Sequence, residues 1–210
     1  MAPRPYSMQK RAATAEETRR RLVDATLALH AERGILATKP ADIAARANVA
    51  LTTYYKHFPT LGDLVRACTT RGRELLPPPD PAAVAALPPD AAARVPRMVR
   101  TLFDYYEARE PWLYTGRTEE RFVPELQPAI EGLRVGRDAF VRVALAGAGA
   151  GRDAVAMATA LVDFWAWRTL RRDIGLTQEE TIRTVTATLQ QLGGIPGPGA
   201  PPGPASPPTT

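Results

Sequence analysis

Residues 47–58 read ANVALTTYYKHF, and residues 52–57 bring together two threonine hydroxyls, two tyrosine rings and two basic groups. Hydroxyl groups donate hydrogen bonds to phosphate oxygens and base edges, and lysine and histidine add positive charge. These residue types at this spacing suit contact with a nucleic acid. The alternative is that the aromatic pair belongs to a core and the polar groups form a solvated helix face.

Each side chain in this stretch has a role that its chemistry favours. Thr52 and Thr53 offer hydroxyls to phosphates or bases and methyl groups to thymine, and Leu51 offers an apolar contact to a thymine methyl. Tyr55 and Lys56 suit phosphate contacts that fix the register on DNA.

Two further residues of this stretch, Tyr54 and His57, have other expected roles. We expect Tyr54 to lie in the core, and His57 is either a phosphate contact or a structural histidine. A hydroxyl at the start of the preceding helix is a further candidate for a phosphate contact. The residues predicted to contact DNA are Thr38, Leu51, Thr52, Thr53, Tyr55, Lys56 and His57.

The elements that must hold these groups are two short helices within residues 40–58, PADIAARANVALTTYYKHF. Small Ala44 permits a close helix crossing, and Val49 is an apolar plug after the turn. Asn48 suits the turn because asparagine tolerates positive φ better than other non-glycine residues. This is the pattern of a helix-turn-helix, whose second helix enters the major groove.

The span from about Thr18 to Arg66 resembles the DNA-binding domain of the tetracycline-repressor (TetR) family. Three blocks carry the resemblance in order: RRRLVDATLALHAERG, ATKPADIAARANV and ALTTYYKHFPTLGDL. The most specific piece is Tyr55-x-His57-Phe58, where the resemblance implies that Tyr55 and His57 face the DNA backbone. It also implies a homodimer that pairs the last two long helices, and a small-molecule pocket in the carboxyl-terminal helices.

The chain departs from the family pattern at several positions. Asn48 replaces the turn glycine, Ala50 replaces the serine that caps the recognition helix, and Thr52 replaces a glycine. Leu61 stands where a phosphate-binding lysine is usual, and His30 where an aromatic residue is usual. We therefore expect the DNA operator sequence of this protein to differ from those of other family members.

Composition narrows the classes of protein. The 210 residues include one cysteine, Cys68, so neither a disulfide framework nor a multi-cysteine zinc site is expected. The sequence contains no run of eighteen apolar residues, so we expect no membrane span. The amino terminus also lacks the apolar region of a secretory signal. We expect a cytoplasmic protein without cofactor or metal, and not an enzyme, because phosphate-loop and hydrolase motifs are missing.

The positive charge is concentrated in the amino-terminal third. Residues 1–75 contain 13 Lys and Arg against 7 Asp and Glu, whereas residues 76–210 contain 14 against 15. This asymmetry is typical of a module that faces a polyanion, joined to a neutral module.

Helical periodicity and Ala, Leu, Arg and Glu usage predict an all-α protein. The expected parts are a flexible basic arm (1–13), a three-helix helix-turn-helix DNA-binding domain (14–75), a larger helical ligand-binding and dimerisation domain (76–192) and a disordered Pro/Gly-rich tail (193–210). Capping boxes are expected at Thr14, Thr60 and Thr177, the last opening a helix over 178–192.

The carboxyl-terminal helices supply large apolar and aromatic side chains. Each can line a small-molecule pocket or simply belong to the core. The pocket candidates are Met98, Leu102, Phe103, Tyr106, Trp112, Phe140, Phe164, Trp167 and Arg168, and the dimer-interface candidates are Val162, Trp165, Ile182, Val185 and Leu189.

These expectations combine into one mechanism. A dimeric repressor would bind a palindromic double-stranded DNA operator and be released by a small-molecule effector that changes the spacing of its recognition helices. The alternative is an architectural or global DNA-binding protein that needs no ligand.

Overall fold

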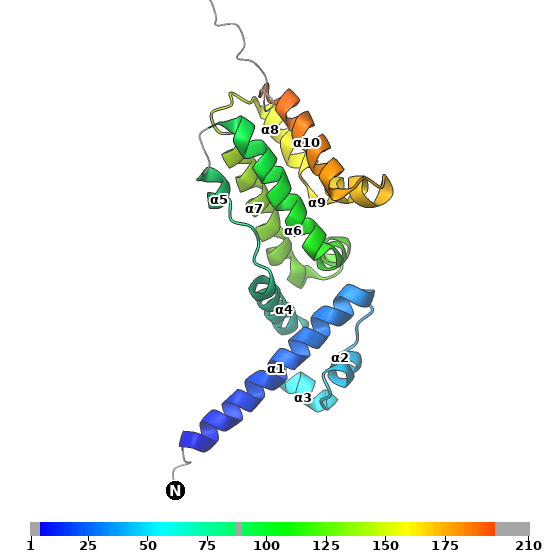
Figure 1. Ribbon diagram of the computed structural model, residues 1–210. Helices are drawn as coiled ribbons and strands as arrows, with labels where there is room; N and C mark the ends of the chain where they lie inside the picture. Colours follow the sequence, from blue (N-terminus) through cyan, green and yellow to red (C-terminus); the bar gives the residue numbers. More distant parts are fainter. Residues whose placement is uncertain (1–4, 87–89, 196–210) are drawn as a thin grey trace, which may run out of the picture. The chain divides into compact units, whose positions relative to one another are not determined.

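The computed structural model describes residues 5–86 and 90–195, and every regular element within them is a helix, as the sequence predicted (Figure 1). None of these helices is long and apolar enough to cross a bilayer. The amino-terminal helices are α1 (Pro5–Arg33), α2 (Pro40–Arg46), α3 (Leu51–His57), α4 (Leu61–Leu75) and α5 (Ala82–Ala85). They are followed by α6 (Ala91–Glu119), a 3-10 turn (Pro124–Leu126), α7 (Gln127–Leu145), α8 (Arg152–Leu161), α9 (Phe164–Arg168), a π-helix (Thr169–Asp173) and α10 (Gln178–Leu192).

The chain forms two compact units. The first comprises Met1–Pro78 and Arg109–Leu133, and the second comprises Pro79–Ala108 and Arg134–Thr210. The first unit is larger than the predicted DNA-binding domain because the end of α6 packs in it. Trp112 Nε1 donates to the Leu27 carbonyl at 3.1 Å, and Thr115 Oγ1 donates to the His30 carbonyl at 3.3 Å.

The core of the first unit is built from α1 to α4. Leu22 and Leu29 of α1 are buried with Ile43 of α2, Tyr54 of α3 and Leu64 of α4. Leu22 and Leu29 thus lie on one apolar stripe of α1. Thr26 also belongs to it, because this fully buried residue returns its hydroxyl to the Leu22 carbonyl at 2.7 Å.

Helix α1 begins earlier than expected. The predicted capping box at Thr14 is wrong: Thr14 lies inside the helix, and its hydroxyl donates to the Lys10 carbonyl at 2.9 Å. Residues 5–13 thus continue α1 instead of forming a flexible arm, because Gln9, Lys10, Arg11 and the alanines after them favour helix and nothing interrupts them. Residues 1–4 of the predicted arm lie outside the described residues.

The second unit is an assembly of helices in which the segment 152–173 is divided. It forms α8, α9 and a π-helix, because Asp163 starts a new helix by accepting from the Trp165 N–H at 3.0 Å. Helix α10 has the predicted bounds, and Thr177 and Glu180 form its capping box. Of the predicted tail, residues 196–210 lie outside the described residues, while Ile195 is buried and donates its N–H to the Gln190 carbonyl at 2.8 Å.

Candidate nucleic-acid interface

The turn between α2 and α3 has the predicted asparagine geometry. Asn48 has φ of 52°, and it is the one non-glycine residue with positive φ in the described part of the chain. Ala44 is buried at the helix crossing, and Val49 packs against the core. Arg21 of α1 holds the turn in place, because its guanidinium donates to the carbonyls of Ala47 and Asn48, at 3.0 Å for Asn48.

The two adjacent tyrosines point in different directions. Tyr54 is 4% exposed and packs beside Phe58, with ring centroids 6.1 Å apart, so its predicted core position is confirmed. Tyr55 is 51% exposed and meets the Tyr54 ring edge-on at 5.2 Å. Burial also raises the pKa of the Tyr54 hydroxyl. One tyrosine anchors α3, and the other is available to a partner.

The ends of α3 reflect the departures from the family pattern. Ala50 occupies the N-cap position and makes no side-chain hydrogen bond, so the helix start lacks the stabilisation of a serine. The next helix, α4, is well capped: Thr60 Oγ1 accepts from the Asp63 N–H at 3.1 Å. Leu61, in the usual place of a lysine, is 42% exposed.

The predicted DNA-contacting residues share one surface except for Thr38. Leu51, Thr52, Tyr55 and Lys56 are exposed along α3, and Thr53 and His57 are half-buried beside them. The Thr38 hydroxyl lies before α2 and already donates to the Gly34 carbonyl at 2.6 Å. It would have to leave this bond to reach a phosphate.

A groove of about 440 Å³ lies between α1 and α3. Its walls are Lys10, Arg11, Thr14, Ala15 and Thr18 from α1, and Thr53, Lys56 and His57 from α3. Neither Lys10 nor Arg11 was among the residues predicted to contact DNA. The signal that would have placed them is the helical continuity of residues 5–18, which the misassigned cap at Thr14 obscured.

Several basic residues of the first unit are occupied within the fold. Arg20 pairs with Glu17 at 2.8 Å, Arg33 with Asp42 at 2.7 Å, and Arg46 with Glu32 at 2.7 Å. Arg46 lowers the pKa of Glu32 chiefly by hydrogen bonding to its carboxylate. Arg19 lies over the Phe58 ring at 5.1 Å. Lys10, Arg11 and Lys56, which line the groove, are exposed and take no part in these pairs.

In the second unit, most of the predicted pocket residues are packed together. Tyr106 lies 5.7 Å from Phe164 and 5.9 Å from Trp167 between ring centroids, and its hydroxyl donates to the Val162 carbonyl at 3.1 Å. Trp112 instead belongs to the first unit, and Arg168 is half-buried, 3.7 Å from Asp173. The fully or almost fully buried members are Met98, Leu102, Phe103, Tyr106, Phe140, Phe164 and Trp167.

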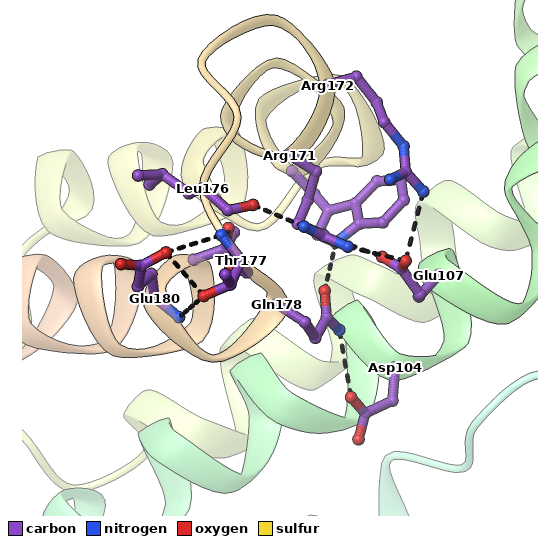
Figure 2. A network of polar contacts seen from close by, with 10 residues as sticks. Asp104, Glu107, Arg171, Arg172, Leu176, Thr177, Gln178 and Glu180 are labelled. Carbon is purple, nitrogen blue, oxygen red and sulfur yellow. Dashed lines mark hydrogen bonds and ion pairs between the residues drawn. The ribbon is translucent and has the colours of Figure 1, made fainter.

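A polar network borders this aromatic cluster (Figure 2). Glu107 of α6 accepts from Arg171 at 2.8 Å and from Arg172 at 3.3 Å, and the Arg171 hydrogen bond lowers the pKa of Glu107. Gln178 connects α9 to α6, since it accepts from Trp167 Nε1 and donates to Asp104, both at 3.2 Å. The network ties the π-helix and the start of α10 to α6.

The predicted dimer residues are mostly inside the chain. Val162, Ile182, Val185 and Leu189 are each at most 5% exposed, so they cannot offer surface to a second copy in this conformation. Ile182, Val185 and Leu189 recur at helical spacing on α10, and the chain's own helices bury the face that they form. Trp165 is 37% exposed and is available at the surface.

The fold and this site define an all-helical protein with an amino-terminal helix-turn-helix domain. Residues 22–68 match the model of the family described as bacterial regulatory proteins, tetR family. By this domain the chain resembles TetR-family regulators, as its three sequence blocks indicated.

Solved structures extend the likeness beyond that domain. A Clostridium perfringens protein, named as a candidate fatty acid metabolism regulator, has a TM-score of 0.62 at 15% identity, covering 82% of this chain and 97% of its own. A candidate TetR-family regulator from Syntrophomonas wolfei has a TM-score of 0.60 at 16% identity, covering 85% and 96%. The multidrug binding protein EbrR, complexed with imidazole, has a TM-score of 0.57 at 21% identity, covering 88% and 93%. These TM-scores, at such low identity, show a shared fold. No curated protein matches the chain.

Proposed function

We propose that this protein is a TetR-like transcriptional repressor that binds a palindromic DNA operator as a homodimer and is released by a small molecule. The observation that carries the proposal is that α3 has one side buried in the core and the other side exposed. Tyr54 and Phe58 anchor the helix in the core, which leaves Thr52, Tyr55 and Lys56 exposed along its other side. A helix held in this way presents base-reading and phosphate-binding groups to the major groove.

Selection of bound fragments from genomic DNA tests the DNA-binding step. We expect one or a few sequences with two-fold symmetry, because a dimer places two recognition helices about one DNA turn apart, ~34 Å. The double variant Thr53→Ala, Lys56→Ala should bind the selected site more weakly, and the exposed pair Arg97→Gln, Arg142→Gln in the second unit is the control. Equal affinity of the double variant and the unmodified protein would refute the assignment of α3.

For the dimer, we propose a surface on α8 and α10 instead of the buried residues named above. These two helices contact each other, and their exposed positions carry small or flexible side chains that permit close helix approach. The exposed residues are Ala156, Met157 and Ala160 on α8, and Thr184, Ala187 and Gln191 on α10.

Sedimentation analysis tests this surface. Ala160→Arg and Ala187→Arg should each convert the dimer to a monomer, because a bulky charge at a small position prevents close packing. Ala93→Arg, at an exposed position of α6, is the matched control and should remain dimeric. An unmodified protein that sediments as a monomer would contradict the proposal itself.

Release by a ligand rests on the carboxyl-terminal aromatic residues. EbrR is a multidrug binding protein whose structures include complexes with ethidium and proflavin. In this chain Tyr106, Phe164 and Trp167 contact one another, so an aromatic effector would have to separate them to enter. Titrating planar aromatic compounds against the operator complex should identify one that lowers DNA affinity.

The same close packing favours the second candidate function, a DNA-binding protein that needs no effector. It predicts that no compound changes operator affinity and that binding is spread over many sites with little sequence preference. A footprint confined to one palindrome would exclude it.

A further inference from the structure

We propose that the groove between α1 and α3 holds the phosphates of one DNA strand, so that the first turns of α1 extend the DNA contact beyond the recognition helix. The inference rests on the proposed function, in which α3 enters the major groove. It assigns to Lys10 and Arg11 a defined position on the DNA backbone.

The first step is the arrangement of side chains around α3. Residues four apart lie on the same side of a helix. Leu51 and Tyr55 therefore share one flank, and Thr53 and His57 share the opposite flank, where they line the groove. A helix in the major groove has one DNA backbone on each side, so the flank with His57 faces a sugar-phosphate strand.

The second step is the surface that α1 adds. Lys10, Thr14 and Thr18 are spaced by four residues and follow one line along the helix, with Arg11 and Ala15 beside them. The small side chain of Ala15 leaves room between the two walls. Figure 1 shows the amino-terminal turns of α1 extending past α3 within this unit. The groove thus continues from the recognition helix towards the start of α1.

The third step is charge. Lys10, Arg11 and Lys56 have no carboxylate partner among the residues that the structure describes. Glu16 lies on the face of α1 opposite the groove, and the Glu17 carboxylate is held by Arg20 at 2.8 Å. Cations without local partners, converging on one open groove, suit a polyanion. Because one wall is the recognition helix itself, a DNA strand is the polyanion that the position selects.

The salt dependence of operator binding tests the proposal. Each phosphate contact contributes about 0.9 to the slope of log K against log salt, so Lys10→Gln, Arg11→Gln should reduce the slope by about 2 per protomer. The ranking of operator variants should not change, because phosphate contacts carry no sequence information. Phosphate ethylation at the outer backbone positions should interfere with binding of the unmodified protein and not of this variant.

The control is Arg97→Gln, Arg142→Gln, which removes the same net charge from exposed positions of the second unit. A slope and an interference pattern equal to those of the control would overturn the inference while the proposed function stands. If the unmodified protein does not bind DNA, both are wrong. If the variant binds DNA like the control but loses a thermal stabilisation by inorganic phosphate, the groove is a free-anion site and the inference is also wrong. Unchanged melting temperatures verify that the variants fold, as expected for exposed side chains.

Discussion

Glu119 accepts hydrogen bonds from the backbone N–H groups of Ile35 and Leu36 through Oε2, both at 2.9 Å. These two N–H groups follow α1, which ends at Arg33, and precede α2. A carboxylate at the last turn of α6 therefore fixes the loop that leads to the helix-turn-helix, within one compact unit.

Replacing Glu119 with alanine should destabilise the first unit. Hydrogen bonds to a charged group contribute about 1.5–3 kcal/mol, and the substitution leaves two backbone donors without this acceptor. Glu119→Gln keeps an acceptor oxygen of the same reach, so a smaller loss is expected. Urea unfolding midpoints measure both changes, and an alanine variant as stable as the unmodified protein would show that the carboxylate is not anchoring the loop.

Gly34 is coupled to the same carboxylate. Its φ is +90°, and a Cβ at this position would collide with Glu119 Oε1. Gly34→Ala should therefore cost more than the ~1 kcal/mol of an unfavourable φ alone. In the double variant Gly34→Ala, Glu119→Ala the collision disappears. The losses of unfolding free energy in the two single variants should therefore sum to more than the loss measured in the double variant. Strict additivity in this double-mutant cycle would contradict the contact.

The sequence predicted local features well because each depends on one residue type and its neighbours. Asn48 in the turn, Tyr54 in the core and the capping box at Thr60 were all readable from spacing and backbone preference. The anchors made by Glu119 and Arg21 were not, since each joins segments that only the folded chain brings together. A short-range pattern contains no signal for them.

Burial was predictable, but the partner that causes it was not. Ile182, Val185 and Leu189 follow a clear helical period, yet periodicity is the same whether a helix packs on its own chain or on a second copy. The start of α1 was misjudged for a related reason. Thr14 and Glu17 satisfy the capping pattern, but the helix-forming residues before them continue the helix.

Substitutions at Asn48 should separate backbone strain from side-chain chemistry. Because φ is 52°, Asn48→Gly should keep or raise stability, by up to about 1 kcal/mol. Asn48→Val places a β-branched residue at positive φ and should cost at least ~1–2 kcal/mol. Thermal melts would check the order Gly, Asn, Val, and a valine variant as stable as the glycine variant would contradict the turn geometry.

Cys68 should be inert in the folded protein. It is 8% exposed, and burial raises the pKa of its thiol to about 12. Since the thiolate is the reactive form, alkylation at pH 8 should be slower than for an exposed cysteine by about three orders of magnitude. The variant Cys68→Ala, Thr70→Cys places a thiol at an exposed position of the same helix and is the control. Equal rates for the two proteins would mean that Cys68 is accessible.

His30 should make the first unit less stable in mild acid. It is 8% exposed, and burial lowers its pKa from 6.5 to about 4, so it is neutral in the folded protein at pH values where the unfolded chain binds a proton. The free energy of unfolding is therefore unaffected by His30 above pH 6.5 and falls as the pH drops from 6.5 towards 4. The loss is about 1.4 kcal/mol per pH unit, or roughly 2 kcal/mol between pH 6.5 and 5. His30→Gln has no proton to bind and should remove this slope, whatever its stability at pH 7. Urea unfolding at pH values from 5 to 7 measures the difference between the two proteins, and parallel curves would show that His30 is not the group that titrates.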